Sequence, residues 1–135
     1  MLINNFMKKL LLLPLFVMLT ACSSLQSYIP SFWDDNQSAR IVDVQLDVDA
    51  IDCGQPQRAQ VAQLRRDLRW FELYSGSKGA RQTDVLKLIK PMQDTVEDWW
   101  KRVDAGQENP VYCQLKKRVL VEQSSRAAKA VLGRF

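Results

Sequence analysis

Residues 83–105, TDVLKLIKPMQDTVEDWWKRVDA, decide the fold class of this chain. Apolar side chains recur in this stretch in alternating steps of four and three residues, at Val85, Ile89, Met92, Val96, Trp99 and Val103. Such spacing is typical of a helix that packs one face against other helices. Pro91 lies in the middle and is expected to kink the helix or to divide it into segments 83–90 and 91–105. Gly106 then marks its end.

Two more segments have helical patterns. Residues 57–75 place apolar side chains at helical spacing, with arginines on the other side: Val61, Leu64, Leu68 and Phe71. Asn109 followed by Pro110 is a typical helix start, an N-cap residue before a proline at the first helical position. The helix that begins there is predicted to continue to about Leu132, where Gly133 follows as a stop signal.

Residues 41–51 fit either a strand or a helix. Val42, Val44 and Leu46 alternate with polar residues as in a strand, while Ile41, Val44 and Val48 fit a helix equally well. We favour a helix because the rest of the chain offers no second strand with which a lone strand could pair. Residues 39–135 are therefore predicted to form an all-α domain, a small antiparallel bundle of three to four helices with short loops.

An export signal precedes this domain. Lys8 and Lys9 are followed by an apolar run from Leu10 to Leu19 and then by Cys22, which is the order of a secretory signal. The run of about ten residues is too short to span a bilayer, which needs about twenty. Pro14 also makes a buried core helix unfavourable. We expect this segment to direct export and to be removed.

The stretch Leu19-Thr20-Ala21-Cys22 resembles the lipobox of bacterial lipoproteins. The resemblance covers residues 7–24 and implies that residues 1–21 are a signal peptide and that Cys22 is acylated, so the only expected cofactor is covalent lipid. Ser23, where an Asp would favour retention at the inner membrane, implies release to the outer membrane. We expect the domain to face the periplasm rather than the cell surface. Met7 begins a signal of the usual shape, so either Met1 or Met7 is the start.

Residues 22–38 are predicted to form the lipidated cysteine and a flexible tether. The segment is rich in Ser, Gln, Asp and Asn, and Pro30 opposes a helix. Four apolar residues interrupt it and could lie at the membrane interface or fold back on the domain: Tyr28, Ile29, Phe32 and Trp33. Two or three acyl chains would hold such a tethered domain at the membrane without a spanning helix.

Cysteine content agrees with export. Once Cys22 carries lipid, Cys53 and Cys113 remain, and pairing is the default in an oxidising compartment. The bond would join the end of the first helix to the first turn of the last one. Metal binding is a poor alternative, because two cysteines in a chain with no His fall short of a four-ligand zinc site. We therefore predict a disulfide and no metal.

Catalytic motifs are missing from the sequence. The chain has no His, no Gly-rich phosphate loop and no serine in a nucleophile elbow. Glu97 and Asp98 precede Trp99 and Trp100, as in some sugar-cleaving sites. Adjacent residues on a helix point about 100° apart, however, so these two carboxylates would not face each other. We expect a protein that is not an enzyme and has no small-molecule substrate.

Charge and aromatic residues offer candidate binding surfaces. Residues 34–52 hold six acidic residues and only Arg40, whereas residues 58–135 hold 16 basic and nine acidic ones. The final helix carries the candidate basic residues Lys116, Lys117, Arg118, Arg126 and Lys129. In the doublets Trp70-Phe71 and Trp99-Trp100 one ring can face the core while its neighbour lies at the surface, which makes Trp70 and Trp100 candidate interface residues.

Two functions follow as expectations. The first is a non-catalytic binding or adaptor module for an envelope protein assembly or sensor. The second is a structural tether or spacer that binds acidic lipid or cell-wall components through the basic C-terminal helix. Export excludes nucleic acid as a partner. Because exposed charges contribute little to stability, reversing Lys116, Lys117 and Arg118 to Glu is expected to leave the fold intact.

Overall fold

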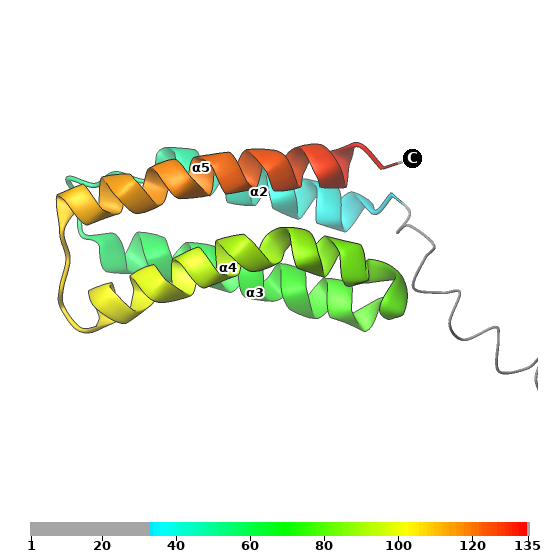
Figure 1. The fold of residues 1–135 in the computed structure, drawn as a ribbon, viewed down its shortest axis with the longest axis horizontal. Helices are drawn as coiled ribbons and strands as arrows, with labels where there is room; N and C mark the ends of the chain where they lie inside the picture. Colours follow the sequence, from blue (N-terminus) through cyan, green and yellow to red (C-terminus); the bar gives the residue numbers. More distant parts are fainter. Residues whose placement is uncertain (1–32, 135) are drawn as a thin grey trace, which may run out of the picture.

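The computed structural model describes residues 33–134, which form four α-helices and one 3-10 helix. In chain order these are α2 (Asp35–Ala50), α3 (Gln57–Ser77), η2 (Ala80–Gln82), α4 (Thr83–Asp104) and α5 (Pro110–Leu132). The helices run up and down in an antiparallel bundle (Figure 1). The predicted all-α bundle, clipped by one disulfide, is confirmed. The predicted signal peptide, Cys22 and most of the tether lie outside the described residues.

The bundle has two layers of two helices. α2 packs beside α5 in one layer, and α3 packs beside α4 in the other (Figure 1). Contacts between α2 and α3 and between α4 and α5 close the bundle, so the α2–α5 side is opposite the α3–α4 side. The start of α2 and the end of α5 lie at the same end as η2 (Figure 1). Within residues 33–134, no helix is long and apolar enough to cross a membrane.

Helix α2 settles the ambiguous segment in favour of a helix. Ile41, Val44 and Val48 are fully buried on one face. The side chain of Asp34 caps the helix by accepting a hydrogen bond from the N–H of Gln37 at 3.0 Å. The helix therefore begins before residue 39, the predicted domain boundary, and residues 35–38 belong to the bundle rather than to the tether. Trp33 lies just before the cap and is exposed.

Helix α4 is continuous through Pro91, so the division of this helix into two segments did not occur. Pro91 itself is exposed, while Ile89 and Met92 on either side of it are fully buried on the core face. A proline inside a helix costs about 3 kcal/mol through the lost hydrogen bond and the steric clash. Burial of the apolar side chains before and after Pro91 offsets that cost and keeps both halves in one helix.

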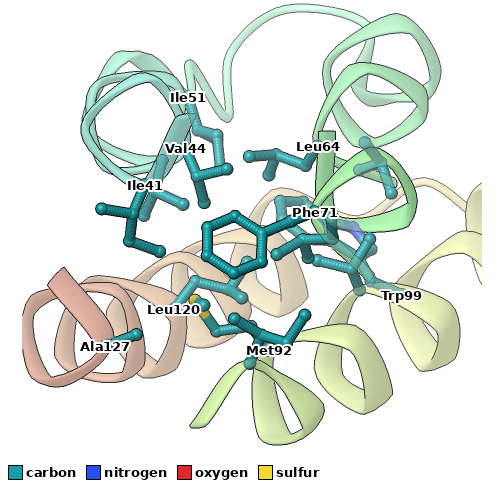
Figure 2. Close-up of a cluster of buried hydrophobic side chains, with 14 of the residues drawn as sticks. Ile41, Val44, Ile51, Leu64, Phe71, Met92, Trp99, Leu120 and Ala127 are labelled. Carbon is teal, nitrogen blue, oxygen red and sulfur yellow. The ribbon is translucent and has the colours of Figure 1, made fainter. Parts of the chain in front are cut away.

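The core gathers side chains from all four α-helices around Phe71 (Figure 2). Trp99 is the largest of the fully buried side chains. Its indole N–H donates to the side-chain oxygen of Gln57 at 3.1 Å, so the one polar atom of the ring is satisfied. The inward residues of both aromatic doublets, Phe71 and Trp99, are thus core residues, as their spacing predicted.

Two contacts fasten the loops at the end of the bundle opposite η2. The disulfide joins Cys53, in the loop after α2, to Cys113, in the first turn of α5, with 5.6 Å between the Cα atoms. Glu108 accepts hydrogen bonds from the backbone N–H groups of Gln57 and Arg58, each at 3.1 Å. Because the N-cap residue Pro56 makes no side-chain cap, the carboxylate of Glu108 serves as the cap of α3.

A carboxylate pair lies between α2 and α3. Asp67 is buried and accepts hydrogen bonds from Arg40 at 3.0 Å and from Gln63 at 2.7 Å. Asp47 lies beside Asp67 at the same site. Burial, together with the carboxylates of Asp67 and Asp43, raises the pKa of Asp47 above its ordinary value. The ionised form of Asp47 therefore destabilises the fold.

We expect Asp47→Asn to raise the free energy of unfolding at pH 7 by roughly 0.5 kcal/mol, because it removes this repulsion from a partly solvated site. A raised folded-state pKa means that the folded chain binds the proton more tightly, so the gain should decline as the pH falls through that pKa and should be absent below the ordinary pKa of the unfolded chain. Urea unfolding at pH 7 and in acid measures both effects. Asp43→Asn is the control, since Asp43 also pairs with Arg40 at 3.8 Å and should give no gain. Loss of stability in Asp47→Asn at pH 7 would contradict this prediction.

Candidate functional site

Trp70 and Trp100 line one groove between α3 and α4. The groove has a volume of about 660 Å³ and receives residues from both helices: Ala62, Arg65, Arg66, Arg69, Trp70, Leu73, Glu97 and Trp100. Both tryptophans are partly exposed, and Leu73 is 57% exposed. The structure thus brings together the two aromatic residues that the sequence singled out, on the side of the bundle opposite α2 and α5.

Positive charge dominates the lining of the groove, with three arginines and one carboxylate. Arg65 pairs with Glu97 at 2.5 Å, and Arg69 pairs with Glu72 at 2.7 Å. Arg66 donates to the side-chain oxygen of Gln63 at 2.5 Å and has no carboxylate partner among residues 33–134. The groove therefore presents a guanidinium group whose charge is not neutralised by the described part of the chain.

Cations hold both indole rings in position. The guanidinium carbons of Arg58 and Arg65 lie 5.5 and 5.3 Å from the ring centroid of Trp100. The guanidinium carbon of Arg40 lies 4.7 Å from the ring centroid of Trp70. These are cation–π distances, which stabilise the ring orientations. Rings that are already ordered lose less conformational entropy when a partner binds, so the groove is preorganised.

A second set of contacts supports Trp70 from α3. Tyr74 stacks on Trp70 with 4.8 Å between the ring centroids, and its hydroxyl donates to Asp34 at 3.1 Å. Lys78 lies 3.4 Å from the same carboxylate. Burial opposes ionisation of Asp34, but the hydrogen bonds from Gln37, Tyr74 and Lys78 hold its pKa below the ordinary value. Asp34 therefore caps α2 and anchors Tyr74 beneath the groove.

The predicted basic surface of the final helix is smaller than expected, because Lys116 and Lys117 face neighbouring helices. The side chain of Lys116 is 16% exposed and pairs with Asp98 of α4 at 2.5 Å. Lys117 donates to the backbone carbonyls of Asp49 and Ile51 at 2.8 and 2.7 Å, and so satisfies free carbonyl groups at the end of α2. The premise that these two lysines are exposed surface charges is therefore wrong, and we expect their reversal to Glu to destabilise the fold.

The contacts of Lys116 with α4 shift the pKa values of the groups involved. Burial alone would lower its pKa, but the contacts with Asp98 and Tyr112 raise it above the ordinary value. The hydrogen bonds from Lys116 and from the Tyr112 hydroxyl, at 2.5 and 2.7 Å, lower the pKa of Asp98 in turn. Reversing the charge of Lys116 would place two carboxylates together at this contact between α4 and α5.

The other predicted basic residues do lie at the surface. Arg118, Arg126 and Lys129 are exposed on α5, and Arg126 pairs with Glu122 one turn earlier. Arg134, after the helix, lies 3.4 Å from Asp84, and its side chain is 11% exposed. The outward basic surface of α5 thus consists of Arg118, Arg126 and Lys129.

Two acidic residues that the sequence placed beside Trp99 point to different helices. Glu97 pairs with Arg65 of α3, and Asp98 pairs with Lys116 of α5. The predicted divergence of these carboxylates is confirmed. Residues 33–134 contain no group of three or more His, Cys, Asp or Glu side chains that could hold a metal ion.

Sequence reasoning did not assign the groove arginines or Leu73 to the binding surface. The signal was available in part, because Arg66 lies four residues before Trp70 and three residues before Arg69 on the same predicted helix. The rotation of α4 about its own axis relative to α3 decides which residues of α4 complete the groove. Periodicity alone does not predict that rotation.

The chain shows no significant match to a known family model, to a curated protein sequence or to a solved structure.

Proposed function

We propose that this protein is a lipid-anchored outer-membrane protein that faces the periplasm and acts as a non-catalytic adaptor. In this proposal, the groove between α3 and α4 captures an acidic, partly apolar segment of another envelope protein. The export signal and the lipobox ending at Cys22 support the location. The observation that supports the activity is the convergence of Trp70 and Trp100 with three arginines in one groove.

The lining of the groove favours a peptide with alternating carboxylate and apolar side chains. Tryptophan and arginine are the residues that most often dominate the binding energy of protein interfaces. An apolar side chain of the partner would lie between the indole rings and Leu73, which is unusually exposed for a leucine. A carboxylate would pair with Arg66, whose guanidinium has no acidic neighbour among the described residues. Charge complementarity thus selects an acidic partner.

The tether or spacer function remains the alternative. It would use the outward basic surface of α5, which consists of Arg118, Arg126 and Lys129 and is reduced by the internal contacts of Lys116 and Lys117. Acidic lipid headgroups or cell-wall material would then be the partners. We favour the adaptor because the groove combines apolar and cationic groups, whereas the basic surface of α5 offers scattered charges.

Capture from membranes tests the adaptor function. We expect the full-length chain, crosslinked in the envelope and purified, to bring down one stoichiometric protein, and Arg66→Glu or Trp100→Ala to reduce its recovery by at least about tenfold. Binding should also weaken with salt, since the Debye length falls from about 10 Å at 0.1 M to about 3 Å at 1 M. Circular dichroism confirms that each variant is folded.

Arg126→Glu is the matched control, because it reverses an exposed arginine of α5, on the opposite side of the bundle. Cys22→Ala is the anchoring control and should take up no labelled palmitate. Recovery of only lipid or cell-wall material, or loss of binding in Arg126→Glu with Arg66→Glu unaffected, would overturn the adaptor in favour of the tether. Palmitate labelling of Cys22→Ala would overturn the lipid anchor.

A further inference from the structure

Exposed apolar side chains are concentrated on the side of the bundle opposite the groove. Among residues 33–134, nine large apolar side chains are exposed, and seven of them belong to α2 and α5: Val42, Leu46, Val111, Leu115, Val119, Val121 and Leu132. The outer faces of α3 and α4 contribute one, Leu73. Since α2 and α5 are neighbours, the exposed Val42, Leu46, Val111 and Val121 belong to one surface, which we call the α2–α5 face. Leu115 and Val119 lie instead on the flank of α5 that carries Tyr112 and Lys116, which contact α4.

Each helix of this face has an outward seam with coiled-coil spacing. On α2, steps of four and three residues connect Asp35, Ala39, Val42, Leu46 and Asp49, all of which are exposed. On α5, steps of three and four residues connect Val111, Gln114, Arg118 and Val121, which are also exposed. These seams are separate from the buried ones that hold the bundle together. Two helices with unused seams can pack against two more helices.

The two helices of the face carry opposite charges. The exposed residues of α2 include Asp35, Asp43 and Asp49, whereas those of α5 include Arg118 and Lys129. The one acidic residue exposed on α5, Glu122, is paired with Arg126 of the same helix. The carboxylate of Asp49 and the guanidinium of Arg118 form no ion pair or hydrogen bond with any of residues 33–134. The α2–α5 face is therefore complementary to itself: its acidic half matches its basic half.

We propose that the α2–α5 face binds a second copy of this chain, with a twofold axis that runs parallel to the helices. That axis places α2 of each copy on α5 of the other, so carboxylates meet guanidinium and ammonium groups. A twofold axis across the helices would instead place α2 on α2 and oppose acidic residues to acidic residues. The parallel axis also keeps the starts of both α2 helices at the same end of the dimer.

Contacts within one subunit give the expected register. Cys113 is bonded to Cys53, and Lys117 contacts the backbone at Asp49. Because α2 and α5 are antiparallel, a residue a given number of positions before Cys53 lies at the same height along the bundle as the residue that number of positions after Cys113. Rotation about an axis parallel to the helices does not change the height of a residue along the bundle, so the same correspondence holds between the two subunits. Leu46 therefore lies near Val121 of the partner subunit, and Asp49 lies near Arg118 of the partner subunit. An apolar centre flanked by opposite charges is the usual anatomy of a specific interface.

The dimer leaves both grooves free. Because α3 and α4 are on the opposite side from α2 and α5, the two grooves point away from each other, and one dimer would present two binding sites. The inference does not depend on the proposed function, since it uses none of the groove residues.

Crosslinking of the full-length chain in the envelope tests the dimer. We expect a photoreactive benzophenone side chain at Leu46 to produce a crosslinked species of two identical chains, while the same group at Leu73 does not. Both leucines are exposed, 61% and 57%, so they are matched in accessibility. Leu46→Glu should weaken self-association by at least about tenfold in sedimentation of the purified chain in detergent, and Leu73→Glu should not.

Charge reversal tests the orientation. Asp49→Arg and Arg118→Asp should each weaken the dimer, and the double variant should restore it, because the twofold axis pairs both positions again. A chain that stays monomeric at all concentrations, or a product at Leu46 that contains lipid or a different protein, would overturn the inference. Loss of partner capture in Leu73→Glu with an intact dimer would support the dimer inference. Failure of the adaptor function is therefore distinguishable from failure of the dimer.

Discussion

Replacing Trp99 with alanine is expected to lower the free energy of unfolding by about 3–5 kcal/mol, the range for large aromatic residues in a core. The ring is fully buried and is the largest such side chain of the bundle. Its removal would leave a cavity and would also leave the side-chain oxygen of Gln57 without its indole donor. Urea unfolding followed by circular dichroism measures the change. Since whole domains are stable by about 5–15 kcal/mol, the variant should be barely folded.

The adjacent tryptophan provides the matched control. Trp100→Ala removes the same number of atoms one residue later, but from the partly exposed groove, so its effect on stability should be much smaller. Trp99→Phe separates packing from hydrogen bonding, because it retains most of the apolar ring and loses the donor to Gln57. Equal losses of stability in Trp99→Ala and Trp100→Ala would contradict the assignment of Trp99 to the core.

The helices and their inward faces follow from local periodicity, and for that reason the sequence predicts them well. Val85, Ile89 and Val96 are buried as their four-and-three spacing requires. Helical geometry also places the two members of each aromatic doublet in different surroundings, since neighbouring residues on a helix point about 100° apart. Periodicity does not show at which residue a helix begins or ends. Asp34 begins α2 earlier than expected because its cap and the buried Gln37 extend the bundle toward the N-terminus.

The partners of surface charges do not follow from the sequence, because they depend on neighbouring helices that are distant along the chain. Lys116 and Lys117 read as part of an exposed basic run, but one pairs with α4 and the other caps the end of α2. Glu108 is an ordinary loop residue in the sequence, and it caps α3 across 50 positions of chain. The groove depends in the same way on the rotation of α4 against α3, which brings Trp100 to the side of Trp70.

Removing the disulfide is expected to destabilise the protein by about 4 kcal/mol in the chain-entropy model, because Cys53 and Cys113 are separated by 60 positions. The bond ties the loop between α2 and α3 to the first turn of α5, and so limits how far the outer helices can separate in the unfolded chain. We expect the double variant Cys53→Ala, Cys113→Ala to unfold at a much lower urea concentration while it retains its helices. Double replacement avoids the unpaired thiol that a single variant would leave.

Chemical reduction gives an independent measure of the same quantity. The unmodified chain in a reducing agent should unfold like the double variant, and the double variant should be insensitive to the agent. Native protein should show no free thiol at either cysteine, as expected for a bond formed in an oxidising compartment. The Glu108 cap at the same end of the bundle does not depend on the bond, so the reduced chain keeps one link between the 105–109 loop and α3. Unfolding curves that coincide with and without the disulfide would show that this link alone orders the loops.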